Sequence, residues 1–286
     1  MNYRHAFHAG NFADVVKHVV LARILVHLRE KEQAFRVIDT HAGAGLYDLA
    51  GEEASRTGEW RDGIGRLLAA TLAPSVQALL APYLAAVAAQ NRGLQPRRYP
   101  GSPLIALELM RPQDRLVACE LETGAAAALA RHLGGDRRAK AIGIDGWVAV
   151  NAYVPPKERR GIVLLDPPYE DKDEFARIGP AVLAAHRKWA TGIYLLWYPI
   201  KDRKGPDQLA RLLGRSGVGK ILRAELGTAE AGEPARLNGA GLIVVNPPWR
   251  LADELSRLLP ALAGVLRTGG GAGTPAVAVD WLANER

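Results

Sequence analysis

The stretch that decides the fold is FRVIDTHAGAG, residues 35–45 of a 286-residue chain. Residues 35–40 form a short apolar run that predicts a buried strand, and Gly43 and Gly45 follow it closely. Glycines after a strand let the backbone approach a ligand, and a helix start beyond them favours polar groups. These two glycines alone do not identify the class of protein, because hydrolases and dehydrogenases also have glycine-rich turns after a strand. The full dinucleotide pattern is missing because position 48 is Asp.

Similar apolar runs recur along the chain and alternate with amphipathic stretches, which is typical of an α/β sheet with covering helices. A helix is expected over 14–29, with Asp14 as its cap or first-turn acid. We expect strands over 35–40, 115–120, 139–145, 161–166, 192–198, 220–226 and 241–246, with 276–282 as a candidate edge strand. The pattern predicts a seven-stranded, doubly wound, Rossmann-like sheet.

One spacing departs from this pattern. About 75 residues separate the first two strands, whereas a single crossover helix needs far fewer. The intervening segment, 48–100, is rich in Ala, Leu and Arg and ends in a basic, proline-marked loop. We interpret the chain as a single domain, 1–286, with a helical insertion over 48–100. The glycine-rich stretch 269–273 is expected to be a loop.

Composition narrows the class of protein. No run of about 18 uncharged apolar residues is present, and the polar start does not resemble a signal peptide, so a cytoplasmic protein outside membranes is expected. The one cysteine, Cys119, excludes an intrachain disulfide and is expected to be buried. The net charge of +7 suits a polyanionic partner, but many basic proteins bind no nucleic acid.

An acid closes each of the next two predicted strands. Glu120 ends the run 115–120, and Asp145 ends the run 139–145. Carboxylates at the carboxyl ends of neighbouring parallel strands face the ligand crevice of an open α/β sheet. Glu120 could then bind ribose hydroxyls, and Asp145 could accept a hydrogen bond from an adenine amino group. Either acid, taken alone, could equally be a helix cap.

The fourth strand closes with Asp166-Pro167-Pro168-Tyr169. An adenine amino nitrogen is a poor nucleophile because its lone pair is delocalised into the ring. Asp166 can accept one N–H and a backbone carbonyl near Pro167 the other, which orients the lone pair toward an electrophile. Tyr169 offers a face for a base that has left its stack. Behind the glycine turn and the two acids, this motif favours transfer of a methyl group to an adenine.

A second stretch, Asn246-Pro247-Pro248-Trp249, fits the same motif. In a seven-stranded sheet of this kind the last strand runs antiparallel, so its carboxyl end lies opposite the crevice. We therefore assign catalysis to Asp166 and expect Trp249 to be a packing residue.

The chain resembles the RlmJ family, bacterial methyltransferases that make N6-methyladenine in 23S ribosomal RNA. The resemblance runs from end to end, in residues 3–18, 39–49, 55–60, 99–106, 159–170, 190–199 and 241–249. It implies a class I methyltransferase fold, S-adenosyl-L-methionine as cofactor, a monomer, and adenine 2030 as the target.

The resemblance also implies roles for residues of this chain. The methyl donor would contact the turn holding Asp39, His41, Gly43 and Gly45, and also His18, Ser102, Glu120, Asp145 and Gly146. Catalysis would involve Asp166, Pro167 and Tyr169. Tyr3 would contact the RNA, with His5 and Lys17 as helpers. The histidine spacings match no zinc pattern, so no metal is expected.

Three other functions fit parts of the sequence. An adenine methyltransferase acting on DNA would carry the same catalytic motif, since that motif does not contact the 2′-hydroxyl. A glutamine methyltransferase uses Asn in place of Asp166, which favours a nucleobase here. A non-catalytic RNA-binding protein on the same fold would not need the intact glycine turn, the strand-end acids and Asp166 together.

Overall fold

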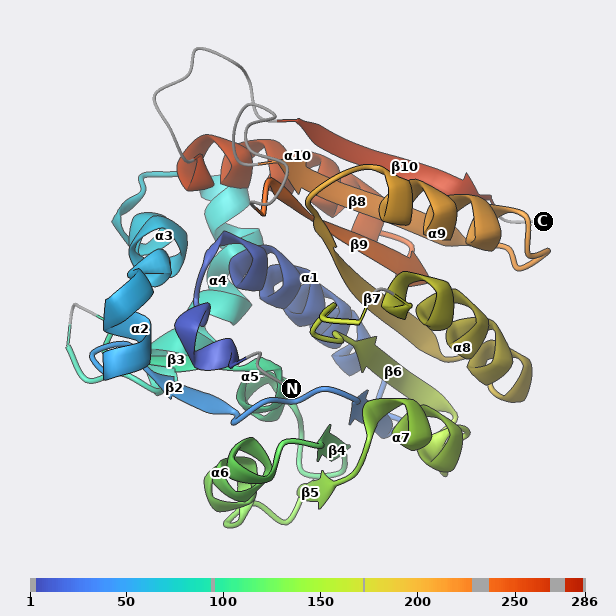
Figure 1. Cartoon of the computed structure of the whole chain (residues 1–286), viewed down its shortest axis with the longest axis horizontal. Helices are drawn as coiled ribbons and strands as arrows, with labels where there is room; N and C mark the ends of the chain where they lie inside the picture. Colours follow the sequence, from blue (N-terminus) through green and yellow to red (C-terminus); the bar gives the residue numbers. More distant parts are fainter. Residues whose placement is uncertain (1–3, 94–95, 172, 228–236, 268–275, 285–286) are drawn as a thin grey trace.

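The computed structural model describes residues 4–93, 96–171, 173–227, 237–267 and 276–284. Its centre is one sheet of eight strands in the order β10-β8-β9-β7-β6-β1-β4-β5 (Figure 1). The strands are β1 (Phe35–Asp39), β4 (Arg115–Glu120), β5 (Ala139–Gly143), β6 (Arg160–Leu165), β7 (Ile193–Ile200), β8 (Ile221–Gly227), β9 (Gly239–Val245) and β10 (Val277–Ala283).

The strand directions confirm the predicted fold class. β5, β4, β1, β6 and β7 pair in parallel, whereas β9 runs antiparallel to both β7 and β8. The expected seven strands are present, and the candidate edge run becomes an eighth, β10, antiparallel to β8. The loop expected over 269–273 lies outside the described residues.

Helices cover both faces of the sheet because successive strand residues point to opposite sides. Val37 and Leu164 face a core shared with α1 (Phe12–Arg29), α4 (Pro74–Ala89), α5 (Ser102–Leu109), α6 (Thr123–Leu133) and α10 (Leu251–Leu266). Ile38 and Leu165 face the other core, which holds α7 (Gly146–Tyr153), α8 (Glu174–Lys188) and α9 (Lys204–Gly214). Cys119 is buried, as expected.

The segment between β1 and β4 is mostly helical and leaves the sheet through a short antiparallel pair. Strand β2 (Leu46–Asp48) pairs with β3 (Arg98–Pro100), and Asp48 lies opposite Arg98. Between them come α2 (Glu52–Thr57), the π-helical turn η2 (Arg61–Gly65), α3 (Arg66–Ala69) and α4. The helices α3 and α4 pack against α10, and α4 also packs against α1, so the segment gathers on one side of the molecule (Figure 1).

The first long helix begins two residues earlier than predicted. Asn11 caps α1, accepting a hydrogen bond from the Asp14 backbone N–H at 3.0 Å, and Asp14 is a first-turn acid. A short 3₁₀ turn, η1 (His5–Phe7), precedes it. No helix among the described residues has the length and apolar character needed to cross a bilayer.

Candidate active site

The parallel strands place the predicted acids side by side. Asp39 ends β1, Glu120 ends β4, Asp145 follows β5 by two residues, and Asp166 directly follows β6. These four strands are neighbours in the sheet and parallel, so their carboxyl ends meet along one edge. A cavity of about 1200 Å³ opens there.

Most of the predicted site residues line this cavity. The lining residues among them are His5, Lys17, His18, His41, Gly43, Ser102, Glu120, Asp145, Gly146, Asp166, Pro167 and Tyr169. Asp39 and Gly45 do not line it, and Tyr3 lies outside the described residues.

Two glycines lie where another chain segment passes too close for a side chain. Gly43 is in the turn after β1, and Gly146, at the start of α7, packs against that turn. Gly43 has a φ of +60°, and a Cβ there would stand 2.1 Å from the Tyr47 hydroxyl. The backbone N–H of Gly43 donates to Glu120 Oε2 at 2.9 Å, which ties the turn to the tip of β4. A Cβ on Gly146 would stand 2.4 Å from the Thr40 carbonyl oxygen. Both glycines therefore keep the backbone close to the cavity.

Asp39 does not line the cavity but is hydrogen-bonded to Ser102, which does. Its carboxylate is buried, and Oδ2 accepts a hydrogen bond of 2.6 Å from the Ser102 hydroxyl. Burial raises the pKa of Asp39 to about 7, and the hydrogen bond from Ser102 opposes that change. Ser102, at the start of α5, lines the cavity and connects Asp39 to it.

His41 is held as a neutral ring beside the strand tips. The Thr40 hydroxyl donates a hydrogen bond of 2.8 Å to the Leu164 carbonyl. Thr40 Oγ1 also lies 2.8 Å from His41 Nδ1. Burial lowers the pKa of His41 to about 4. Its ring also meets the Trp147 ring edge-on, with centroids 5.5 Å apart.

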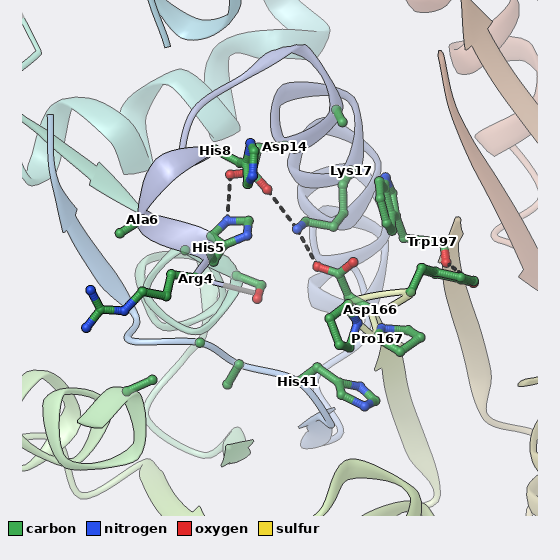
Figure 2. A pocket seen from close by; sticks show the side chains of 18 of the residues that line it. Arg4, His5, Ala6, His8, Asp14, Lys17, His41, Asp166, Pro167 and Trp197 are labelled. Carbon is green, nitrogen blue, oxygen red and sulfur yellow. Dashed lines mark hydrogen bonds and ion pairs between the residues drawn. The ribbon is translucent and has the colours of Figure 1, made fainter. Parts of the chain in front are cut away.

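A buried ion network connects α1 to the proline motif. Lys17 Nζ donates to Asp166 Oδ2 at 2.5 Å and to Asp14 Oδ1 at 2.8 Å, and Asp14 Oδ2 lies 2.9 Å from His5 Nε2 (Figure 2). Burial lowers the pKa of Lys17, but Asp14 and Asp166 outweigh it, so the pKa is raised overall. Lys17 is 4% exposed, and its ammonium is committed to these two carboxylates. This geometry favours orientation of Asp166 over the predicted contact between Lys17 and RNA.

Tyr169, three residues after Asp166, is held by its hydroxyl and by its ring. Its φ is +53°, a left-handed conformation, and its hydroxyl donates to the Trp197 carbonyl at 2.8 Å. Its ring lies 4.7 Å from that of Phe175, centroid to centroid. Trp197 reaches the cavity from β7, near Asp166 and Pro167 (Figure 2).

The second proline motif lies at the opposite end of the sheet. Asn246 follows the antiparallel strand β9, and its side-chain amide donates to the Ala190 and Gly192 carbonyls before β7. It lines a separate cavity of about 200 Å³ that shares no residue with the larger one. The expectation that Trp249 is a packing residue is wrong, because the residue is 70% exposed and its ring contacts only the Arg250 guanidinium among the interactions of the described residues.

Sequence reasoning missed several residues of the cavity wall. Asp14, expected only as a helix acid, accepts from both His5 and Lys17. Glu174 lines the cavity but belongs to no motif. Tyr99 lies behind His18 rather than in the cavity wall, and it was not singled out although it belongs to the resembling stretch 99–106. Burial raises the pKa of Glu174 to about 7. The described residues contain no cluster of three or more His, Cys, Asp or Glu side chains arranged to hold a metal ion.

Comparisons with known proteins identify the family of this chain. The family model described as "Ribosomal RNA large subunit methyltransferase D, RlmJ" matches residues 32–283. Proteins named "Ribosomal RNA large subunit methyltransferase J" are 40% identical over 285 residues in Escherichia coli and 39% over 286 in Haemophilus influenzae, covering all of each chain.

A solved structure is similar over nearly the whole chain. The crystal structure of protein LPL1258 from Legionella pneumophila superimposes with a TM-score of 0.87 at 31% identity, covering 96% of this chain and 98% of that one. Full-length sequence relatives, a family match over most of the chain and a shared fold lead to one conclusion: this chain belongs to the RlmJ family of ribosomal RNA large subunit methyltransferases.

Proposed function

We propose that this protein uses S-adenosyl-L-methionine to methylate the exocyclic amino group of an adenine in 23S ribosomal RNA, at adenine 2030. The observation that carries the proposal is the position of Asp166-Pro167-Pro168-Tyr169. This motif follows a parallel strand and lines the same cavity as the glycine turn and the two strand-end acids. A cytoplasmic, monomeric protein is part of the proposal and rests on the family relationship.

The residues at the strand tips fit the methyl donor. The donor's adenine would lie at Asp145 and Gly146, where a side chain on position 146 would clash with Thr40. Glu120 is half-buried at the tip of β4 and would bind the ribose hydroxyls. His18 carries a buried ring nitrogen, Nε2, that has no hydrogen-bond partner among the described residues. When bound, S-adenosyl-L-methionine supplies an electrophilic methyl group.

Residues of the proline motif would orient the adenine amino group. Asp166 would accept one N–H, and a backbone carbonyl near Pro167 would accept the other. The nitrogen lone pair would then point toward the methyl group. Transfer would break the donor's S–CH3 bond as the N–C bond forms, and Asp166 would accept the proton that the amino group releases. The two prolines fix φ along the turn and so restrict where that carbonyl points.

Lys17 would hold Asp166 in the required position. Its ammonium is bonded to both Asp14 and Asp166 inside the protein, so the Asp166 side chain has a fixed orientation and an ionised partner. Asp166 Oδ2 faces Lys17, and its side chain is 13% exposed at the cavity. The other carboxylate oxygen can accept the substrate N–H.

The substrate end of the cavity would hold the flipped base. Tyr169 would stack on it, since its hydroxyl and backbone conformation keep the ring in place. Tyr3 and His5 are proposed RNA contacts. Lys201 also lines this cavity and is a proposed phosphate contact, whereas Arg4 is ion-paired with Glu53.

The deciding experiment measures transfer of a labelled methyl group to unmodified ribosomal RNA, with an equal mass of unmethylated DNA in parallel. Nucleoside digestion should give N6-methyladenosine from RNA alone. Label in DNA alone would keep the chemistry but overturn the RNA substrate. Failure to transfer to either polymer, with the donor still bound, would point to a protein acceptor or an RNA-binding assembly factor.

Asp166→Ala tests the catalytic assignment. We expect kcat to fall at least about 100-fold, since an oriented proton acceptor contributes about this much. Donor binding should survive, because Lys17 keeps Asp14 as its partner. If calorimetry detects no donor binding to the folded variant, the assignment of Asp166 as the residue that contacts the adenine amino group would be wrong.

A further inference from the structure

Three buried side chains form a hydrogen-bond chain behind the cavity. His18 Nδ1 lies 2.7 Å from the Tyr99 hydroxyl, which lies 3.1 Å from the Tyr83 hydroxyl. The three come from α1, β3 and α4, so the chain reaches from the helical segment to the cavity wall. Both tyrosines are fully buried, and His18 is 1% exposed.

His18 carries a single ring proton. Burial lowers the pKa of His18 well below its usual value, and the neighbouring Lys17 ammonium acts in the same direction. The ring is therefore neutral at physiological pH, and one of its two nitrogens is protonated.

Counting the phenolic protons decides which nitrogen this is. Each buried hydroxyl has one proton to donate, and Tyr99 is the partner that the described residues give Tyr83. If Tyr83 donates to Tyr99 and Tyr99 donates to His18 Nδ1, both phenolic protons are satisfied. In the reverse direction, Tyr83 would keep a buried proton without an acceptor in the described protein, which costs about 1–3 kcal/mol.

The favoured arrangement places the ring proton on Nε2. That nitrogen lacks a partner in the described protein, and His18 lines the cavity beside α5, where Ser102 also lines it. A donor with adenine at Asp145 and ribose at Glu120 would extend its amino-acid end toward β1 and Ser102. Of the two groups at that end, the carboxylate accepts hydrogen bonds and the ammonium does not.

We propose that Tyr99 is a positioning residue that fixes His18 as the Nε2–H tautomer, so that His18 donates to the carboxylate of the methyl donor. Tyr83 donates to Tyr99 and so does not compete with His18 for the Tyr99 proton. The identity of the ligand rests on the proposed function, whereas the tautomer is a property of the free protein. His41 supplies a contrast, since Thr40 donates to Leu164 and can therefore accept from His41 Nδ1–H.

The tautomer can be read by nitrogen-15 NMR of the histidine rings in ligand-free protein, with signals assigned by loss in His18→Gln and His41→Gln. We expect His18 protonated at Nε2 and His41 at Nδ1 in the same spectrum. A His18 ring protonated at Nδ1 overturns the proposal.

Two single-hydroxyl deletions make a matched pair. Tyr99→Phe removes the donor to His18, so both tautomers should be populated and in exchange. Tyr83→Phe deletes an equally buried hydroxyl but leaves Tyr99 free to donate, so His18 should stay protonated at Nε2. Equal behaviour of the two variants would overturn the positioning role of Tyr99.

Calorimetry tests the carboxylate with three ligands. S-Adenosylhomocysteine has the carboxylate and the ammonium, its decarboxylated analogue has the ammonium alone, and methylthioadenosine has neither. His18→Asn should weaken binding of the first about 10- to 100-fold, since a hydrogen bond to a charged group contributes about 1.5–3 kcal/mol. Binding of the other two should change less than about twofold. His18→Gln, whose amide reaches the Nε2 position, should restore most of the affinity.

The outcomes separate the two proposals. Equal losses for all three ligands would overturn the carboxylate as partner of His18. If wild-type protein bound none of the ligands, the proposed function would fail, but the tautomer measured in free protein would still stand or fall by itself.

Discussion

Asp39 couples its ionisation to folding, because its carboxylate is buried and its pKa is raised to about 7. The unfolded chain releases this proton near the ordinary value of 3.8, whereas the native protein keeps it until about pH 7. The native state thus binds more protons across that window. Its stability from this group is complete below pH 3.8 and declines as the pH rises through about 7.

Asp39→Asn should remove this decline while leaving an acceptor for Ser102. Between pH 4 and pH 8, the free energy of unfolding of the variant should rise relative to wild type by up to about 4 kcal/mol, at about 1.4 kcal/mol per pKa unit. Urea unfolding at a series of pH values measures it. The control Glu52→Gln removes an exposed carboxyl and should follow wild type. Parallel curves for Asp39→Asn and wild type would contradict the prediction.

Sequence reasoning at this scale worked where a residue belongs to a motif. Glu120, Asp145 and Asp166 each end a recognisable strand, and all three line the cavity. The partners of Lys17 could not be predicted, because Asp166 is 149 positions away. Trp249 follows two prolines at a surface turn, and its distance from the crevice wrongly suggested a packing role.

At the scale of elements, the antiparallel direction of β9 separates the two proline motifs. Asn246 holds the end of β9 to the segment before β7 through hydrogen bonds of 2.7 and 2.8 Å. Its φ of +53° is a conformation that Asn tolerates better than most residues. The motif therefore has a structural explanation at a place remote from the larger cavity.

Asn246→Ala should lower the free energy of unfolding by about 1–3 kcal/mol, through lost hydrogen bonds and a strained φ. Methyl transfer per folded molecule should stay within about twofold of wild type. Asn246→Gly is the matched variant, since it relieves the backbone strain but not the hydrogen bonds, and should lie between. A fall in kcat as large as that of Asp166→Ala would show that catalysis was assigned to the wrong motif.

Long, apolar elements were predicted to within two residues, because burial on both sheet faces leaves continuous apolar runs. The pair β2 and β3 was missed. Each strand has three residues, and the partners lie about 50 positions apart, so neither alternation nor a turn signal marks them. The cap of α1 was missed because Phe12 and Ala13 separate Asn11 from the first clear helical periodicity.

At the scale of the whole molecule, a net charge of +7 should dominate RNA binding. Each phosphate neutralised releases counterions, so affinity for RNA should fall with salt at a logarithmic slope steeper than about −2, equivalent to about three phosphates on single strands. Fluorescence anisotropy of labelled RNA at a series of salt concentrations measures this slope. Binding of S-adenosylhomocysteine, measured by calorimetry in the same buffers, should change far less. A flat RNA curve would mean that surface charge plays little part.

The α/β fold class could be predicted from the spacing of apolar runs. The cores on the two faces of the sheet follow from the alternation of side chains along each strand. The cavity depends on tertiary contacts that no local pattern encodes. It forms where α1, the glycine turn and the tips of β4, β5, β6 and β7 converge, from segments spread over most of the chain.

The short pairing of β2 with β3 has a consequence for how this protein can change during evolution. Asp48 and Arg98 face each other, so the chain leaves the methyltransferase frame and re-enters it at one point. Because these ends are adjacent, the segment between Asp48 and Arg98, here called the cassette, can vary in length without shifting the register of the large sheet. A cassette swapped between relatives would carry Tyr83 with it but leave His18 behind. Since Tyr99 and His18 both stay with the frame, chimeras should keep the donor affinity of the parent that supplies the frame.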